Sequence, residues 1–223
     1  MSVPRNMFWR GYWAVTLAAL CVGVFLAVRA PAEAGGGGMQ RLVYLHLPVA
    51  INALIGALIV CGSGVAYLHS HRPGWDDLAR GAAIVTVLDS TVLLLTGMIW
   101  AKAAWGHWWV WSPRLSFSLA FWCIYVIYLV IRAGIQSSAR RAVISSIFGI
   151  VAFLDVPLLY LSAKLLPDVH PTVVTVTAGM YPALFVCLAG ITLLSAGCIA
   201  AFYRFGTVAR LRGDALHGLI GPT

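Results

Sequence analysis

Two histidines stand in similar settings far apart in the chain, and both could bind a metal. His46 lies in "RLVYLHLPVAINAL", two residues before Pro48, and His170 lies in "LPDVHPTVV", directly before Pro171. Proline restricts the backbone around it and so limits the directions in which each imidazole can point. Because neutral imidazole is the commonest metal ligand in proteins, we regard His46 and His170 as candidate ligands of one metal.

The ligand types narrow the choice of metal. Two histidines without a cluster of carboxylates or thiolates make a poor zinc site, which usually needs three or four protein ligands. They suffice for the two axial positions of a haem, because the macrocycle supplies the remaining nitrogens. The five cysteines lie inside apolar runs and form no CxxC, CxxCH or Cys/His zinc spacing. If the two histidines bind one metal, the cofactor that they suit is therefore haem b, bound non-covalently. Two solvated histidines at a membrane interface remain the alternative.

A tryptophan-rich stretch offers flat apolar walls for such a macrocycle. Residues 104–117 read "AWGHWWVWSPRLSF", with four tryptophans within seven positions, namely Trp105, Trp108, Trp109 and Trp111. The haem propionates would need cations, for which the candidates are Arg41, Lys102 and Arg114. Tryptophan is also common at membrane interfaces simply because its ring is amphipathic. An interfacial belt with no role in binding therefore remains the alternative explanation of these residues. Trp105 and Trp109 are four residues apart, and a short interfacial helix would place both on one face.

The composition indicates what kind of fold positions these residues. Hydrophobic residues make up 61% of the 223 residues, charged residues 10%, and the mean hydropathy is +0.90. This balance is typical of a chain embedded in a bilayer. The net charge of +8 comes from scattered basic residues without a basic stripe, so nucleic acid is not an expected partner.

The apolar stretches predict an all-α, polytopic membrane protein with six transmembrane helices and a tryptophan-rich loop on its outer face. A span needs about 20 apolar residues, and six stretches qualify: 11–29, 46–68, 82–101, 114–132, 142–163 and 179–203. We expect one membrane domain over 1–203 and a basic cytoplasmic tail over 204–223, at the surface or partly disordered. The first span competes with a cleaved signal peptide ending in "APAEAG", but its apolar run is long for one.

The distribution of Lys and Arg predicts the orientation. With the N-terminus inside, ten basic residues fall on the cytoplasmic side and five on the outer side, so both termini are expected in the cytoplasm. His69, His71 and His217 then lie inside, in polar segments typical of solvated residues. His46, His107 and His170 lie outside, on the same face as the tryptophans.

Three motifs together resemble a known family. "WGHWWVWSPRL" resembles the tryptophan-rich WWD signature of the haem-handling proteins of cytochrome c biogenesis, and "YLHLP" and "DVPLLYLSAKLLPDVHP" resemble the histidine-bearing segments that flank it. The resemblance covers most of residues 40–175. By position, His46 and His170 match the axial ligands of the haem iron. The signature is matched by Trp105, Gly106, Trp109, Trp111, Arg114 and Leu115, with Trp108 as a further ring.

The resemblance implies a haem-delivery protein of the bacterial inner membrane rather than an enzyme. Haem would be held at the outer, periplasmic face and passed to a membrane-anchored haem chaperone, CcmE. The implied partners are the ABC-transporter subunits CcmA and CcmB and the small membrane protein CcmD.

The sequence departs from the family pattern at three places. Ser112 replaces the acidic residue of the signature, Asp155 stands where the family often has Asn, and "KLLPD" replaces the tryptophans before the second histidine. Asp89 and Asp155 lie within predicted spans, where a carboxylate is costly and suggests a role. Asp155 precedes Pro157 by two residues and could bond backbone groups that the proline leaves unpaired.

Two other classes of protein remain as alternatives. A b-type cytochrome subunit of a membrane oxidoreductase would carry ligand histidines in the middle of its helices, and no predicted span has one. A solute permease would show an internal repeat or interrupted helices, and neither is clear in this sequence.

Overall fold

A computed structural model describes residues 5–31, 38–166, 170 and 177–220. Side chains are not described at Arg5, Gly38, Ala163, Asp214 and 216–220. Helices are the only regular secondary structure among the described residues, which confirms the all-α prediction. The elements are α1 (Arg5–Arg29), η1 (Gly38–Leu42), α2 (Val43–Ser70), α3 (Pro73–Trp105), α4 (Pro113–Gly134), α5 (Ser138–Ala152), α6 (Asp155–Leu165), η2 (Ala178–Met180) and α7 (Tyr181–Ile220).

Six helical segments of the described chain are long and apolar enough to cross a membrane. Each overlaps one of the six predicted spans, so the prediction of a multi-pass membrane protein is confirmed. Their bounds are Asn6–Arg29, Met39–Ser70, Pro73–Trp105, Pro113–Gly134, Ser138–Ser162 and Ala178–Gly213.

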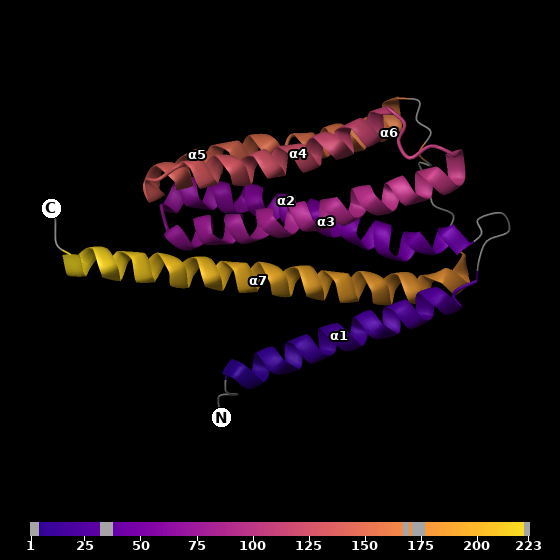
Figure 1. Cartoon of the computed structure of the whole chain (residues 1–223), viewed down its shortest axis with the longest axis horizontal. Helices are drawn as coiled ribbons and strands as arrows, with labels where there is room; N and C mark the ends of the chain where they lie inside the picture. The colour runs from indigo at the N-terminus through magenta and orange to yellow at the C-terminus, as the bar shows by residue number, and fades with distance from the viewer. Residues whose placement is uncertain (1–4, 32–37, 167–169, 171–176, 221–223) are drawn as a thin grey trace.

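The helices form an elongated bundle with α2 and α3 at its centre (Figure 1). α7 packs along α2 and α3 on one side and carries α1 on its own outer side, while α4, α5 and α6 cover the other side. The N-terminal end of α1 and the C-terminal end of α7 both lie toward one end of the bundle, which we call the terminal end. The α3–α4 connection, η1 and the end of α6 lie at the opposite end, which we call the loop end.

Small residues allow the central helices to approach closely. Ala53 and Ala57 of α2 are buried in one cluster with Ala82 and Ala83 of α3. In a membrane, close backbone packing of this kind replaces the hydrophobic drive that water supplies elsewhere. α2 meets α5 just as closely at Gly64, where a Cβ would lie 2.9 Å from the carbonyl oxygen of a residue in α5.

Polar side chains link α7 to the two central helices. Asn52 of α2 donates to Thr192 Oγ1 at 3.1 Å. Ser195 Oγ donates to Asp89 Oδ2 of α3 at 3.0 Å. A carboxylate within a span needs such a partner, so Asp89 has a structural link to α7.

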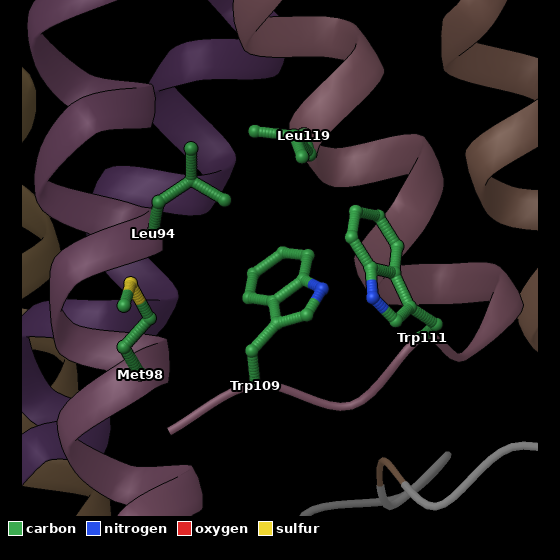
Figure 2. Close-up of a pocket in the computed structure, with 5 residues that line it drawn as sticks. All are labelled: Leu94, Met98, Trp109, Trp111 and Leu119. Atoms are coloured by element: carbon green, nitrogen blue, oxygen red, sulfur yellow. The ribbon is translucent and has the colours of Figure 1, made fainter.

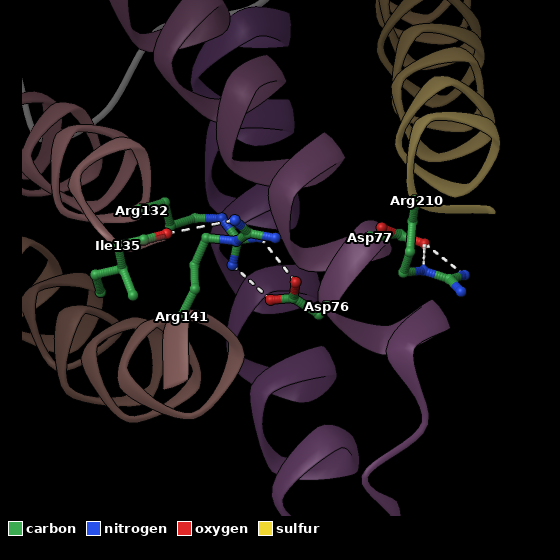
Figure 3. Close-up of polar contacts among 6 residues, drawn as sticks. All are labelled: Asp76, Asp77, Arg132, Ile135, Arg141 and Arg210. Atoms are coloured by element: carbon green, nitrogen blue, oxygen red, sulfur yellow. Dashed lines mark hydrogen bonds and ion pairs between the residues drawn. The ribbon is translucent and has the colours of Figure 1, made fainter. Parts of the chain in front are cut away.

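Two neighbouring carboxylates at the start of α3 bind two other helices (Figure 3). Arg132 of α4 makes a bidentate ion pair with Asp76, with N–O distances of 2.5 and 2.9 Å. Arg210 of α7 pairs with Asp77 at 3.0 Å. The first pair is the more buried, with side-chain exposures of 6% and 12% against 29% and 9% for the second. The terminal end of α3 is thus fixed to α4 on one side and to α7 on the other.

The fifth span is interrupted between α5 and α6. Pro157 has no N–H to donate to the carbonyl of Phe153, and its ring would clash with that carbonyl in a continuous helix. The carbonyl oxygen of Phe153 accepts from the N–H of Val156 at 3.1 Å instead. Asp155 is 7% exposed, and its Oδ2 has no hydrogen-bond partner among the described residues.

α7 is longer than the sixth predicted span. It continues as a helix to Ile220, so residues 204–220 of the expected basic tail extend α7 at the terminal end. Thr207 and Arg210 both donate to Asp77 Oδ2 and hold this extension against α3. Residues 221–223 lie outside the described part of the chain.

Candidate functional site

The tryptophan-rich stretch forms a short non-helical connection at the loop end. α3 ends at Trp105, and Gly106 adopts the left-handed conformation with φ 78° while its N–H donates to Lys102 O at 3.1 Å. Glycine is the residue that adopts this helix-ending conformation at least cost. Because Gly106 ends the helix, Trp109 lies outside it, and the prediction of one short helix with Trp105 and Trp109 on the same face is wrong.

Ser112 begins the next helix. Its backbone is extended, its Oγ accepts from the N–H of Leu115 at 3.5 Å, and Pro113 occupies the first helical position. Serine and aspartate are about equally favoured as N-cap residues, because both offer an oxygen to the free N–H groups of the first turn. Ser112, which replaces the acidic residue of the signature, therefore occupies a position where either residue can cap α4.

The four tryptophans divide into two groups. Trp105 packs edge to face on Trp100, with ring centroids 5.1 Å apart, while Trp109 packs edge to face on Trp111, with centroids 5.7 Å apart. Trp108 and Trp111 are 54% and 76% exposed. By exposure, the four tryptophans therefore form a half-buried group, Trp105 and Trp109, and an exposed group, Trp108 and Trp111.

An apolar pocket of about 230 Å³ lies between α3, the connection and α4. Figure 2 shows the indole of Trp109 standing between the side chains of α3 and the ring of Trp111. The indole Nε1 of Trp109 is buried and has no hydrogen-bond partner in the described part of the chain. The lining residues are Leu94, Met98, Trp109, Trp111 and Leu119.

The two candidate histidines come together at the loop end. His46 lies in the first turns of α2, and its ring centroid is 6.4 Å from that of His170, with 25° between the ring planes. Metal–imidazole bonds are about 2 Å long, so two imidazoles on opposite sides of one iron have ring centres about 6 Å apart. The residues next to His170 (167–169 and 171–176) lie outside the described part of the chain, including Pro171.

α3 supplies three residues around this pair that the motifs did not reveal. His46 Nδ1 lies 2.9 Å from Thr96 Oγ1, and Trp100 packs on His170 with ring centroids 6.3 Å apart. A Cβ on Gly97 would lie 3.3 Å from Cε1 of His46. Thr96 and Trp100 are one helical turn apart, but their spacing alone could not indicate that this side of α3 faces α2.

The three candidate cations differ in their surroundings. Lys102 is exposed and donates from Nζ to the carbonyl of Gly106 at 2.9 Å, and Arg41 is exposed in η1. Arg114 is half-buried in the first turn of α4 and interacts electrostatically with His46. His107 is exposed in the connection. Arg114 thus interacts with one member of the histidine pair.

The donor set fits a haem better than a bare metal ion. Among the described residues, no group of three or more His, Cys, Asp or Glu side chains could hold a metal. Two imidazoles at a bis-axial separation, together with aromatic rings and a cation, are what a macrocycle with its own nitrogens and two carboxylates requires.

Comparison with known proteins agrees with this chemistry. Residues 4–215 match the family model described as "Heme exporter protein C", CcmC. The chain belongs to the heme exporter protein C family.

Relatives of the heme exporter protein C family occur in bacteria and in a plant. The chain is 26% identical over 158 residues to a putative cytochrome c biosynthesis ccmC-like mitochondrial protein of Marchantia polymorpha, covering 71% of this chain and 65% of that protein. It is 26% identical over 141 residues to heme exporter protein C of Paracoccus denitrificans, covering 62% and 58%. The match to the Escherichia coli K12 heme exporter protein C is 24% over 178 residues, covering 76% and 72%. The chain thus spans about three fifths of the length of the first two relatives.

Proposed function

We propose that this chain holds haem b non-covalently at the loop end and delivers it to an acceptor during cytochrome c maturation. His46 and His170 are the axial ligands of the iron. The protein acts as a binding and transfer component and is not itself the catalyst of a bond-forming reaction.

The observation that carries the proposal is the placement of the two histidines. They are 124 positions apart in the sequence (170 minus 46), yet their rings lie nearly parallel with centroids 6.4 Å apart. This separation supports two axial ligands on one iron. Family membership over residues 4–215 supports haem as the cargo.

The rest of the site has partners for the other parts of the macrocycle. Trp105 and Trp109 are half-buried at the loop end and offer apolar rings to its edge. The Arg114 guanidinium and the positive end of the α4 helix dipole favour an anion, which suits a propionate. Gly106 and Leu115 act through the backbone, by ending α3 and by donating to Ser112.

The exposed tryptophans and the orientation of the chain in the membrane suggest how haem is passed on. Trp108 and Trp111 are exposed beside the site and are available to an acceptor. The acceptor is a CcmE-like haem chaperone, and CcmA, CcmB and CcmD are the other expected partners. The count of ten basic residues against five puts both termini in the cytoplasm and the loop end on the periplasmic face of the inner membrane.

The b-type cytochrome alternative has less support. Such a subunit would hold its haem between histidines in the middle of the helices, whereas His46 lies in the first turns of α2 at the loop end. His69 and His71 lie at the other end of α2, where His71 ends the helix.

Titration of the purified protein with haem tests the proposal. We expect the wild type to give the absorbance spectrum of a low-spin haem with two axial histidines. His46→Ala and His170→Ala should each change it to a five-coordinate spectrum and lower haem retention, because a lost ligand leaves the iron held on one side.

His107→Ala is the matched control. This histidine lies at the same end but is exposed in the connection, so its loss should leave the spectrum unchanged. If His107→Ala removed the haem while His46→Ala left the spectrum intact, the ligand assignment would be wrong.

A further inference from the structure

We infer that Thr96 is a positioning residue for His46: it fixes the tautomer and the ring orientation that leave Nε2 free for the iron. The tautomer of His46 is a property of the haem-free protein. The statement that Nε2 binds iron rests on the proposed function. The inference adds a role for a residue on α3 that lies outside all three sequence motifs.

The direction of the hydrogen bond follows from the neighbours of the Thr96 hydroxyl. Thr96 Oγ1 lies 2.9 Å from His46 Nδ1, 2.8 Å from Val92 O and 3.1 Å from Leu93 O. Carbonyl oxygens only accept, and a hydroxyl has one proton to donate. When that proton goes to the carbonyls of the preceding turn, as is common for threonine within a helix, the hydroxyl accepts from Nδ1–H of His46. The lone pair of the ring is then on Nε2.

The same helix contains a second threonine where this direction is unambiguous. Thr91 Oγ1 donates to Val87 O at 2.7 Å and lies 2.8 Å from Trp122 Nε1. An indole N–H can only donate, so the Thr91 hydroxyl must accept from the neighbouring helix while donating to its own. Thr96 repeats this arrangement five residues later, with His46 in place of Trp122.

Burial and close packing hold the arrangement in place. Thr96 is 7% exposed, so water has little access to its hydroxyl. Gly97 borders the same imidazole, since a Cβ there would lie 3.3 Å from His46 Cε1. The ring is therefore limited on one side by the backbone of α3 and fixed in rotation by the hydrogen bond. Partners of this kind orient metal-ligating histidines and raise their basicity.

The first test reads the tautomer in the haem-free, full-length protein in detergent micelles. Nitrogen-15 NMR of the histidine rings should show His46 protonated at Nδ1 in the wild type, with the signal assigned by its loss in His46→Gln. In Thr96→Val this preference should be lost, and Thr96→Ser should restore it. A wild-type His46 protonated at Nε2 would overturn the inference whatever the haem result.

The second test adds haem and measures the affinity and the reduction potential. We expect Thr96→Val to weaken haem binding by about 10–100-fold and to raise the potential, because a less basic imidazole stabilises the ferric iron less. Thr96→Ser should resemble the wild type. If the wild type shows a bis-histidine spectrum, an unchanged affinity and potential in Thr96→Val would overturn the part of the inference that links Thr96 to the iron.

Thr91→Val is the matched control, since it removes a half-buried hydroxyl on the same helix that bonds Trp122 instead of His46. It should leave the tautomer and the potential unchanged, and an equal effect of both variants would mean that Thr96 acts only through general stability. If the wild type has the Nδ1–H tautomer but binds haem without a bis-histidine spectrum, the proposed function fails while the role of Thr96 in orienting the ring stands.

Discussion

Among the single residues, Trp109 and Trp108 form a matched pair, since they are adjacent in the connection but differ in environment. Trp109 lines the apolar pocket and is half-buried, whereas Trp108 is 54% exposed. We expect Trp109→Leu to raise the Kd for haem by about 3–10-fold, because leucine keeps apolar bulk but removes the flat ring. Trp108→Leu should leave the Kd within about twofold. Haem titration followed by absorbance measures both, and equal effects would favour the interfacial-belt alternative.

The role of Arg114 can be tested by changing the ligand as well as the protein. We expect Arg114→Gln to weaken haem binding by about tenfold, since it removes a charged donor to a propionate. Haem dimethyl ester, which lacks the propionate charges, should bind the wild type more weakly than haem does. It should bind Arg114→Gln no more weakly than the wild type. An additive loss from the ester and the substitution would contradict a direct contact.

For single residues, the sequence motifs predicted the candidate haem ligands but not the residues that contact and orient them. His46 and His170 could be chosen because each imidazole stands beside a proline in a distinctive segment. Thr96 and Gly97 lie in an apolar span where many positions have the same composition. Only the packing of α2 on α3 selects the side of α3 that meets His46, so the sequence of α3 alone cannot identify them.

Among the elements, the packing of α2 on α5 gives a prediction with an internal control. Gly64 and Gly62 lie on the same helix, but a Cβ at Gly64 would be 2.9 Å from the carbonyl oxygen of Ser146, whereas Gly62 has nothing within 4 Å. Gly64→Ala should destabilise the fold by about 1–3 kcal/mol, because a backbone atom cannot rotate away. Gly62→Ala should be neutral or stabilise by up to about 1 kcal/mol. Denaturant unfolding in detergent micelles measures both variants, and an equal response would argue against close α2–α5 contact.

The ion pairs at the start of α3 should differ in strength. Asp76→Asn leaves Arg132, which is 6% exposed, without its charged partner, and loss of one member of a buried pair costs about 3–5 kcal/mol. Arg210→Gln removes a side chain that is 29% exposed and leaves Asp77, 9% exposed, with the hydroxyl of Thr207 as a remaining donor. A smaller loss of about 1–2 kcal/mol is therefore expected. Unfolding midpoints of the two variants and of Asp76→Asn/Arg132→Gln give the comparison. A larger loss in Arg210→Gln would reverse this ranking.

Hydropathy predicted the spans well because length and apolar composition are local properties. The break between α5 and α6 was not predicted, because 142–163 was taken as one span, although Pro157 is a residue that can interrupt a helix. The connection at Gly106 was predicted wrongly, because the spacing of Trp105 and Trp109 was read as helical and the preference of glycine for ending a helix was not weighed. The ion pairs of Asp76 and Asp77 join residues 56 and 133 positions apart, which no local pattern reveals.

For the whole molecule, the two ends of the bundle should face different compartments. The described ends of α1 and α7 lie at the terminal end, opposite the α3–α4 connection (Figure 1). We expect reporter fusions at both termini to be active in the cytoplasm. A cysteine introduced as His107→Cys should react with a membrane-impermeant thiol reagent from the outside. The parent protein, with its natural cysteines, is the control, and labelling of position 107 from the cytoplasmic side would contradict the orientation.

The gathering of distant segments at one end was predictable, because six spans necessarily alternate sides. The order of the helices around α2 and α3 was not, since apolar helices of similar composition can be arranged in many ways. The placement of α1 against α7 depends instead on close contacts such as Gly197 of α7 against Tyr12 and Trp13 of α1.

α3 runs as one continuous helix from the terminal end of the molecule to the loop end. It contains 33 residues, a length of about 50 Å. The ion pairs of Asp76 and Asp77 fix one end of it, and Thr96 lies 20 positions further along (96 minus 76), or about 30 Å from that turn. A tilt of about 5° there moves Thr96 by about 2–3 Å, which exceeds the length of a metal–imidazole bond at about 2 Å. A tilt of this size, with every helix intact, would therefore be enough to separate Thr96 from His46.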